Sequence, residues 1–219
     1  MPEMIEILRQ EHHKIEGLLR VLERELSLFD RGERPDYEVV LAVIDYFEDY
    51  PDACHHPKED MIVEKLRARD PVAAATIGDL EAEHQAGTKC LRGVAQAVER
   101  VLSDQDLVRE NVANIIRDFI DHERQHMGME ERVVFPAALN ALQPQDWADI
   151  ALKLADRYGT FHQLRFEEKF NKARRSILKM EEEVQAERPD WATAPIAGGT
   201  AQTPPSAVSR HRRENRGCI

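Results

Sequence analysis

The sequence predicts an all-α protein: an up-down-up-down four-helix bundle with an additional C-terminal helix and a disordered tail. Apolar residues recur at three- and four-residue steps along almost the whole chain to residue 185, as on the buried face of an amphipathic helix. Four such stretches are long and joined by short links, which favours antiparallel neighbours. From residue 188 the chain is rich in Pro, Gly, Ala, Ser and Thr, a composition typical of disorder.

The first two helices are expected to be separated by a turn at Arg31 and Gly32, where the first apolar stripe ends. The second helix covers about residues 37–69. It contains Pro51 and Pro57, so a kink or break is expected between these two prolines.

The boundaries of the remaining helices are predicted from the same kind of helix-stop and turn residues. The third is predicted over about 72–102 and the fourth over about 106–142. A fifth helical segment covers 145–187, with Gly159 as a break. We therefore expect one domain, residues 1–187, made of a core bundle (1–142) and the extra segment (145–187), followed by the tail at 188–219.

Charge and hydropathy exclude two classes of partner. The formal net charge is -11, which disfavours binding to nucleic acid or to an anionic membrane. Apolar runs fall far short of the ~20 residues that span a bilayer. The N-terminal residues show no signal peptide. A cytoplasmic protein without nucleic-acid or membrane partners is predicted.

Histidines occupy the apolar stripes of the first four predicted helices. The chain has nine histidines, and each of these helices places at least one on its stripe: His12, His55, His84 and His126. An unpartnered polar group in a core costs about 2–7 kcal/mol. A metal shared among the helices would compensate for that cost.

Two carboxylates extend this pattern. Glu59 follows His55 by four residues, and Glu130 follows His126 by four, so each pair shares one helix face. Imidazole together with carboxylate suits iron, and a carboxylate has two oxygens that can bridge two metals. The two HxxxE copies therefore indicate a two-fold-like site for a pair of irons.

Other histidines lie next to these four positions. His12 is favoured over His13 because it shares the face of Ile15 and Leu19. His56, one position off the stripe, and His122, one turn before His126, remain open as additional ligands or as neighbours that support the ligands.

Four short motifs resemble the hemerythrin-like, or HHE cation-binding, domain family over about residues 1–142: EHHKI, HHPKED, LEAEH and HMGMEERVVFPA. The resemblance implies a four-helix bundle with two non-haem Fe ions joined by an oxo or hydroxo bridge. Carried over by motif, the ligands would be His12, His55, Glu59, His84, His126 and Glu130, with Glu59 and Glu130 as the bridging carboxylates.

The sequence departs from the animal hemerythrins of this family at two motifs. Those proteins carry HxxxH in the third helix, but here Thr88 stands four residues after His84. They also close with HxxxxD, where this chain has HxxxE. The missing imidazole leaves a coordination gap that His56, His122, water or a tyrosine would fill, and an oxygen-carrier role is not implied.

The predicted function is a metal-binding protein whose di-iron centre binds, senses or reacts with O2, peroxide or NO, so that the partner is a small diatomic or peroxide ligand. No dedicated catalytic motif is present, and weak oxygen or peroxide chemistry stays open. One alternative is an iron or oxygen sensor that acts through metal-coupled folding. Another is a ferritin-like carboxylate enzyme that uses the ExxH pairs Glu81/His84 and Glu123/His126.

Overall fold

The computed structural model describes residues 2–187 apart from 104, 106–107 and 159, and it leaves out the side chains of 158–164. The described residues form helices and contain no strand, which confirms the all-α class. The elements are α1 (Glu3–Asp30), α2 (Tyr37–Tyr50), η1 (Pro51–His55), α3 (His56–Arg69), α4 (Pro71–Ala75), α5 (Leu80–Leu102), α6 (Arg109–Met129), η2 (Glu130–Val134), α7 (Phe135–Ala141), α8 (Pro144–Tyr158) and α9 (Thr160–Glu187).

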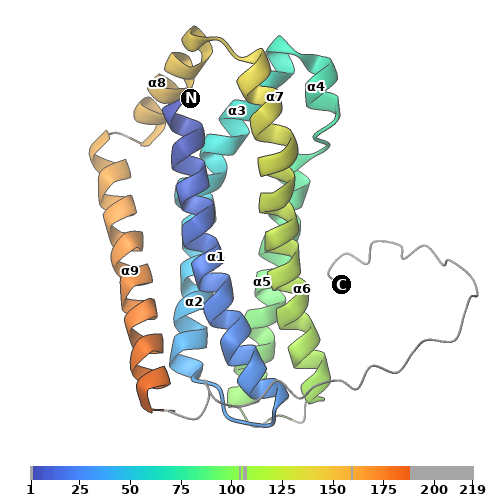
Figure 1. Cartoon of the computed structure of the whole chain (residues 1–219), viewed down its shortest axis with the longest axis vertical. Helices are drawn as coiled ribbons and strands as arrows, with labels where there is room; N and C mark the ends of the chain where they lie inside the picture. The colour runs from blue at the N-terminus through green and yellow to red at the C-terminus, as the bar shows by residue number, and fades with distance from the viewer. Residues whose placement is uncertain (1, 104, 106–107, 159, 188–219) are drawn as a thin grey trace, which may run out of the picture.

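The long helices lie side by side (Figure 1). Helix α1 contacts α2 and α6, and α5 contacts the same two helices, so these four enclose a common interior. Helix α3 continues α2 through η1, and α7 continues α6 through η2. Helix α8 packs on α3, and α9 packs along α2 and α1 (Figure 1).

The buried interior is divided into two hydrophobic clusters. One contains Leu18, Leu19 and Phe119, and the other contains Leu8 and Phe135. On α1, the second cluster ends at Leu8 and the first begins at Ile15. The buried polar residue His12 lies between them in sequence. A polar layer is thus held between two apolar layers, which exclude water from it.

The predicted third helix was wrong at its start. The helix expected from residue 72 is interrupted after α4, and α5 begins only at Leu80. Gly78 has a φ of 81°, a left-handed conformation that Gly adopts without strain. Asp79 then caps α5, because its carboxylate accepts a hydrogen bond from the Ala82 backbone N–H at 3.1 Å.

The predicted kink near Pro51 and Pro57 takes the form of a π-helical turn, η1, and the chain stays helical on both sides. A second π-turn, η2, begins at Glu130, the last residue of the other HxxxE motif. Each π-turn ends two residues before a proline, Pro57 or Pro136. Since proline lacks an N–H and its ring clashes with the carbonyl four residues earlier, a widened turn relieves the helix at that point.

Other boundaries were closer to the prediction. Helix α6 begins at Arg109, and residues 106–107 lie outside the described part of the chain. Helix α8 ends at Tyr158 and α9 begins at Thr160, whereas Gly159 itself is not described. The tail at 188–219 also lies outside it, so its disorder and the domain division stay predictions. In the described residues, no helix is long and apolar enough to cross a membrane.

Replacing Leu19 by Ala should destabilise the fold by about 2–5 kcal/mol, because its side chain is fully buried and truncation leaves a cavity. The free energy of unfolding in urea measures this. Leu41→Ala is the matched control on α2, where the leucine is 39% exposed, and we expect a change below about 0.5 kcal/mol. Equal losses in both variants would contradict the assignment of this core.

Candidate metal centre

The six predicted ligands all lie in the polar layer between the hydrophobic clusters. They come from α1, η1, α3, α5, α6 and η2. Each is at least 91% removed from solvent, with exposed fractions of 5% for His12, 2% for His55, 0% for Glu59, 9% for His84, 7% for His126 and 0% for Glu130. Segments far apart in the sequence therefore bring their histidines and carboxylates to one dry place.

These side chains fall into two groups that share Glu59. The first group is His12, His55, Glu59 and Glu130, and the second is His56, Glu59, His84 and His126. Within each group, one nitrogen or oxygen atom from every residue lies within 4.8 Å of the others, a spacing that could accommodate a metal ion.

The two carboxylates face both groups. Glu59 Oε1 lies 2.9 Å from His55 Nε2 and 3.5 Å from His12 Nε2, whereas its Oε2 lies 3.5 Å from His84 Nε2. Glu130 Oε2 lies 3.3 Å from His12 Nε2, and its Oε1 lies 3.5 Å from His126 Nε2. Each carboxylate thus presents one oxygen to each group, as a bridging ligand does.

The inward-facing atoms lack conventional partners. The Nε2 atoms of His12, His55, His84 and His126 and all four oxygens of Glu59 and Glu130 are buried without a well-aligned hydrogen bond among the described residues. Buried polar atoms are normally hydrogen-bonded, and clusters of exceptions require an explanation such as a bound ion. The donor set therefore fits a pair of metal ions on grounds independent of the sequence motifs.

The outer nitrogens of most of these imidazoles are held by carboxylates. Nδ1–H donates to Glu131 from His12 at 3.1 Å, to Glu11 from His55 at 2.9 Å and to Asp52 from His56 at 2.9 Å. His84 Nδ1 lies 3.7 Å from Asp60 Oδ1. A carboxylate on Nδ1 fixes the tautomer that leaves Nε2 free to bind a metal and makes it more basic. His126 is the exception, because its Nδ1 has no partner among the described residues.

Protons partly compensate the buried carboxylates of the first group when no ion is bound. Burial lowers the pKa of His12, but the Glu130 and Glu59 carboxylates outweigh burial and raise it to about 9. Burial opposes protonation of His55 too, yet the charge of Glu59 and the bond to Glu11 raise its pKa to about 10. This stabilisation of the metal-free fold is complete below the ordinary histidine pKa of 6.5 and is lost as pH rises through 9 and 10.

The second group has a different electrostatic character. Burial, reinforced by the neighbouring His84 and His56, lowers the pKa of His126 to about 3, so its ring is neutral at pH 7. Burial also lowers the pKa of His56, whereas at His84 the Glu59 carboxylate outweighs burial and raises the pKa. Glu130 of the first group lies beside His126, and burial together with the nearby Glu59 charge raises its pKa to about 7. Neutral imidazoles are the form in which histidine binds metal.

A buried ion pair beside the first group was missed by sequence reasoning. Lys58 Nζ donates to Glu11 Oε1 at 2.6 Å and to the Cys54 carbonyl at 2.5 Å, and both charged side chains are at most 3% exposed. Glu11 also accepts the hydrogen bond from His55. The burial of Glu11 could have been predicted from its position, because it lies three residues after Leu8 on the apolar stripe of α1.

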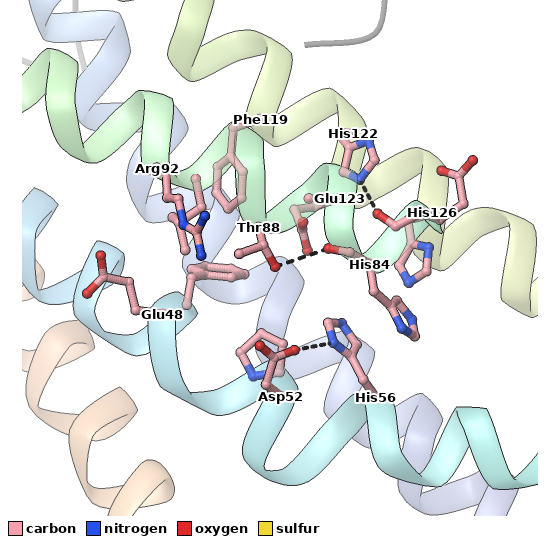
Figure 2. A pocket seen from close by; sticks show the side chains of 15 residues that line it. Glu48, Asp52, His56, His84, Thr88, Arg92, Phe119, His122, Glu123 and His126 are labelled. Carbon is pink, nitrogen blue, oxygen red and sulfur yellow. Dashed lines mark hydrogen bonds and ion pairs between the residues drawn. The ribbon is translucent and has the colours of Figure 1, made fainter. Parts of the chain in front are cut away.

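The structure distinguishes the three remaining histidines near the site by their contacts. His56 stacks on His84 with ring centroids 3.7 Å apart and belongs to the second group (Figure 2). His122 belongs to neither group, and its Nε2–H donates to the Glu83 carbonyl at 3.2 Å (Figure 2). His13 is exposed, and its ring bonds the Arg9 carbonyl at 2.7 Å.

The ferritin-like arrangement finds no support in this geometry. Glu81 is exposed on α5 and Glu123 lines a cavity, and neither belongs to the two metal-ligating groups found among the described residues. His12 and His55, which that reading leaves without a role, are among the most buried polar groups.

Comparison with known proteins gives one match. The family model described as the hemerythrin HHE cation binding domain matches residues 3–145, about two thirds of the chain. No curated protein and no solved structure matches the chain. The match spans every residue of both groups.

Replacing Lys58 by Met should destabilise the metal-free protein by about 3–5 kcal/mol, because the buried Glu11 carboxylate loses its cation. Urea unfolding measures the loss, and Glu11→Gln in the same chain should restore part of it. Lys153→Met is the matched control: its ion pair with Glu64 is exposed, so we expect less than about 1 kcal/mol. A Lys58 variant as stable as this control would refute the role of the pair.

Proposed function

The chain belongs to the hemerythrin HHE cation-binding domain family, and we propose that its two residue groups hold a pair of metal ions bridged by Glu59 and Glu130. The observation that carries this proposal is the orientation of the two buried carboxylates. Each of them directs one oxygen to the first group and the other oxygen to the second. A carboxylate that served only one ion would leave its other oxygen buried and uncompensated.

Iron is the metal that this donor set favours. Imidazole and carboxylate ligands suit iron, and the number of converging nitrogen and oxygen donors exceeds the four of a structural zinc site. The centre would be a non-haem di-iron site with an oxo or hydroxo bridge. Iron would supply reversible electron exchange with O2, peroxide or NO, the small ligands that we propose as partners.

His56 fills the coordination gap in this proposal. The position one turn after His84 is Thr88, whose hydroxyl donates to the His84 carbonyl at 3.1 Å and so serves its own helix. His56 instead adds an imidazole to the second group, with its Nδ1 held by Asp52 (Figure 2). The two positions would then have two and three imidazoles, respectively.

The chain's own residues would set the protonation of the site. His12 and His55 hold protons that a metal displaces, while Glu11 and Lys58 form a compensated pair that keeps the His55 ring oriented. The two hydrophobic clusters exclude water from the first position, which strengthens these electrostatic interactions.

Bundle topology and cellular location form part of the same proposal. Because α1, α2 with α3, α5, and α6 with α7 each contribute ligands, we propose that they are the four members of an up-down-up-down bundle in which α8 and α9 are additions. The site would act in the cytoplasm, where its partner is a small ligand rather than nucleic acid or membrane.

Replacing His12 by Ala should remove at least one of about two iron ions per chain, since the first group loses an imidazole. Elemental analysis of protein from iron-rich expression, with the near-ultraviolet spectrum of an oxo-bridged pair, is the measurement. His13→Ala is the control, because the adjacent histidine is exposed and outside both groups. Iron-free wild-type protein would sink the proposal.

Metal affinity should rise with pH. Because the pKa of His12 is about 9 and that of His55 about 10, both are protonated at pH 7 and must release protons to bind metal. The apparent affinity for Zn2+, measured by chelator competition, should therefore increase at least about tenfold per pH unit between pH 6 and 8. An affinity independent of pH over this range would show that these imidazoles are not displaced.

A further inference from the structure

A cavity of about 250 Å³ adjoins only one of the two groups (Figure 2). It lies among α2, η1, α5 and α6, and His56, His84 and His126 form part of its wall. Its described lining includes none of the residues found only in the first group, His12, His55 and Glu130. A molecule in this cavity would therefore meet the second metal position.

Two small residues of α5 keep the cavity open. A Cβ atom at Gly87 would lie 2.9 Å from Glu123 Oε1 and 3.2 Å from His122 Nε2, so any larger residue would displace these side chains. Thr88, the next residue, turns its hydroxyl back to the His84 carbonyl (Figure 2). Longer side chains at these positions would occupy the space.

The wall combines an apolar surface with polar side chains, among them Glu123. Phe47, Leu91 and Phe119 provide the apolar part. Glu123 points between Thr88 and His84 (Figure 2), and no described residue forms a hydrogen bond with its carboxyl group. A carboxyl group in this place can accept a hydrogen bond from an O–H group. This pattern is that of a small-molecule pocket, in which a few polar groups orient an apolar body.

Charge and size narrow the ligand class. The exposed residues of the lining include Glu48, Asp52 and Glu83 against a single cation, Arg92, so the mouth of the cavity repels anions. The volume of 250 Å³ equals that of roughly eight waters at about 30 Å³ each. A diatomic molecule would leave most of this space unfilled.

We propose that the cavity binds a small neutral organic molecule with an O–H head group, either an alcohol or a hydroperoxide. The apolar body packs against Phe47, Leu91 and Phe119, and the head group bonds to Glu123 and faces the second metal position. The inference rests on the proposed metal pair and adds the class of molecule that this pair meets.

Ligand-observed NMR titrations of zinc-loaded protein test the proposal without redox chemistry. Cumyl alcohol and cumene hydroperoxide share one body and differ in the head group, so their relative affinities identify the preferred source of the O–H group. Benzoate tests the exclusion of anions, and cumene tests the apolar wall alone. We expect binding of at least one O–H ligand and at least about tenfold weaker binding of benzoate.

Two variants locate the bound molecule. Gly87→Leu should abolish binding, whereas Gly93→Leu on the same helix should not, because a Cβ atom there meets only Ile115 Cγ2 at 3.6 Å. Glu123→Leu should weaken the binding of cumyl alcohol about fivefold and leave the affinity for cumene unchanged, since only the head group loses a hydrogen bond. If Gly87→Leu does not fold, the Glu123 variant alone decides whether the ligand binds in this cavity.

The outcomes separate this inference from the proposed function. Failure of the wild-type protein to bind zinc or iron overturns the metal pair, and the same titrations on metal-free protein then judge the cavity. Metal-loaded protein that binds neither O–H ligand overturns the cavity proposal alone. So does equal binding of benzoate, or O–H ligand binding that is unchanged in both cavity variants.

Discussion

The buried carboxylate of Glu59 is the constraint on which the rest of the site depends. It is fully removed from water, and a charge in that position is tolerated only with close compensation. Histidines from α1, η1 and α5 supply it in the metal-free protein, and they hold the pKa of Glu59 well below its usual range although burial alone would raise it. Helix α1, helix α5 and the continuous segment of α2, η1 and α3 must therefore meet at one level, and the two hydrophobic clusters lie on either side of that level.

Much of this arrangement was predictable because each helix places its polar residue on an apolar stripe. The positions of His12, His84 and Glu130 follow from helical periodicity, and the positions of their helices follow from bundle geometry. Periodicity failed at His56, where η1 departs from the α-helical repeat, and at residue 72, where the Gly78 conformation and the Asp79 cap override an apolar pattern. The Lys58 pair was missed because its long-range partner, Glu11, is 47 residues away.

The two candidate ligand groups differ in ways that the near-repeat of the HxxxE motifs does not suggest. The first is enclosed, with Nδ1 atoms held by Glu131 and Glu11. The second adjoins a cavity and contains His126, whose Nδ1 lacks a partner in the described part of the chain. Two ions in these positions would differ in ligand basicity and in access to small molecules. This difference favours separate roles for the two ions. The first would keep its ligands, and the second would exchange small molecules with the cavity.

The π-turns give the site an unusual sensitivity to insertions and deletions. Each turn accommodates one residue more than an α-helix would, and η1 ends on the first of two adjacent histidines, His55 and His56. Loss of a single residue such as Ala53 would close the turn to an α-helix and restore the clash between the Pro57 ring and the carbonyl four residues before it, although the helices on either side would keep nearly the same phase. No change in composition or hydrophobicity would reveal the damage. In these segments, the structure constrains the number of residues as strictly as it constrains their types.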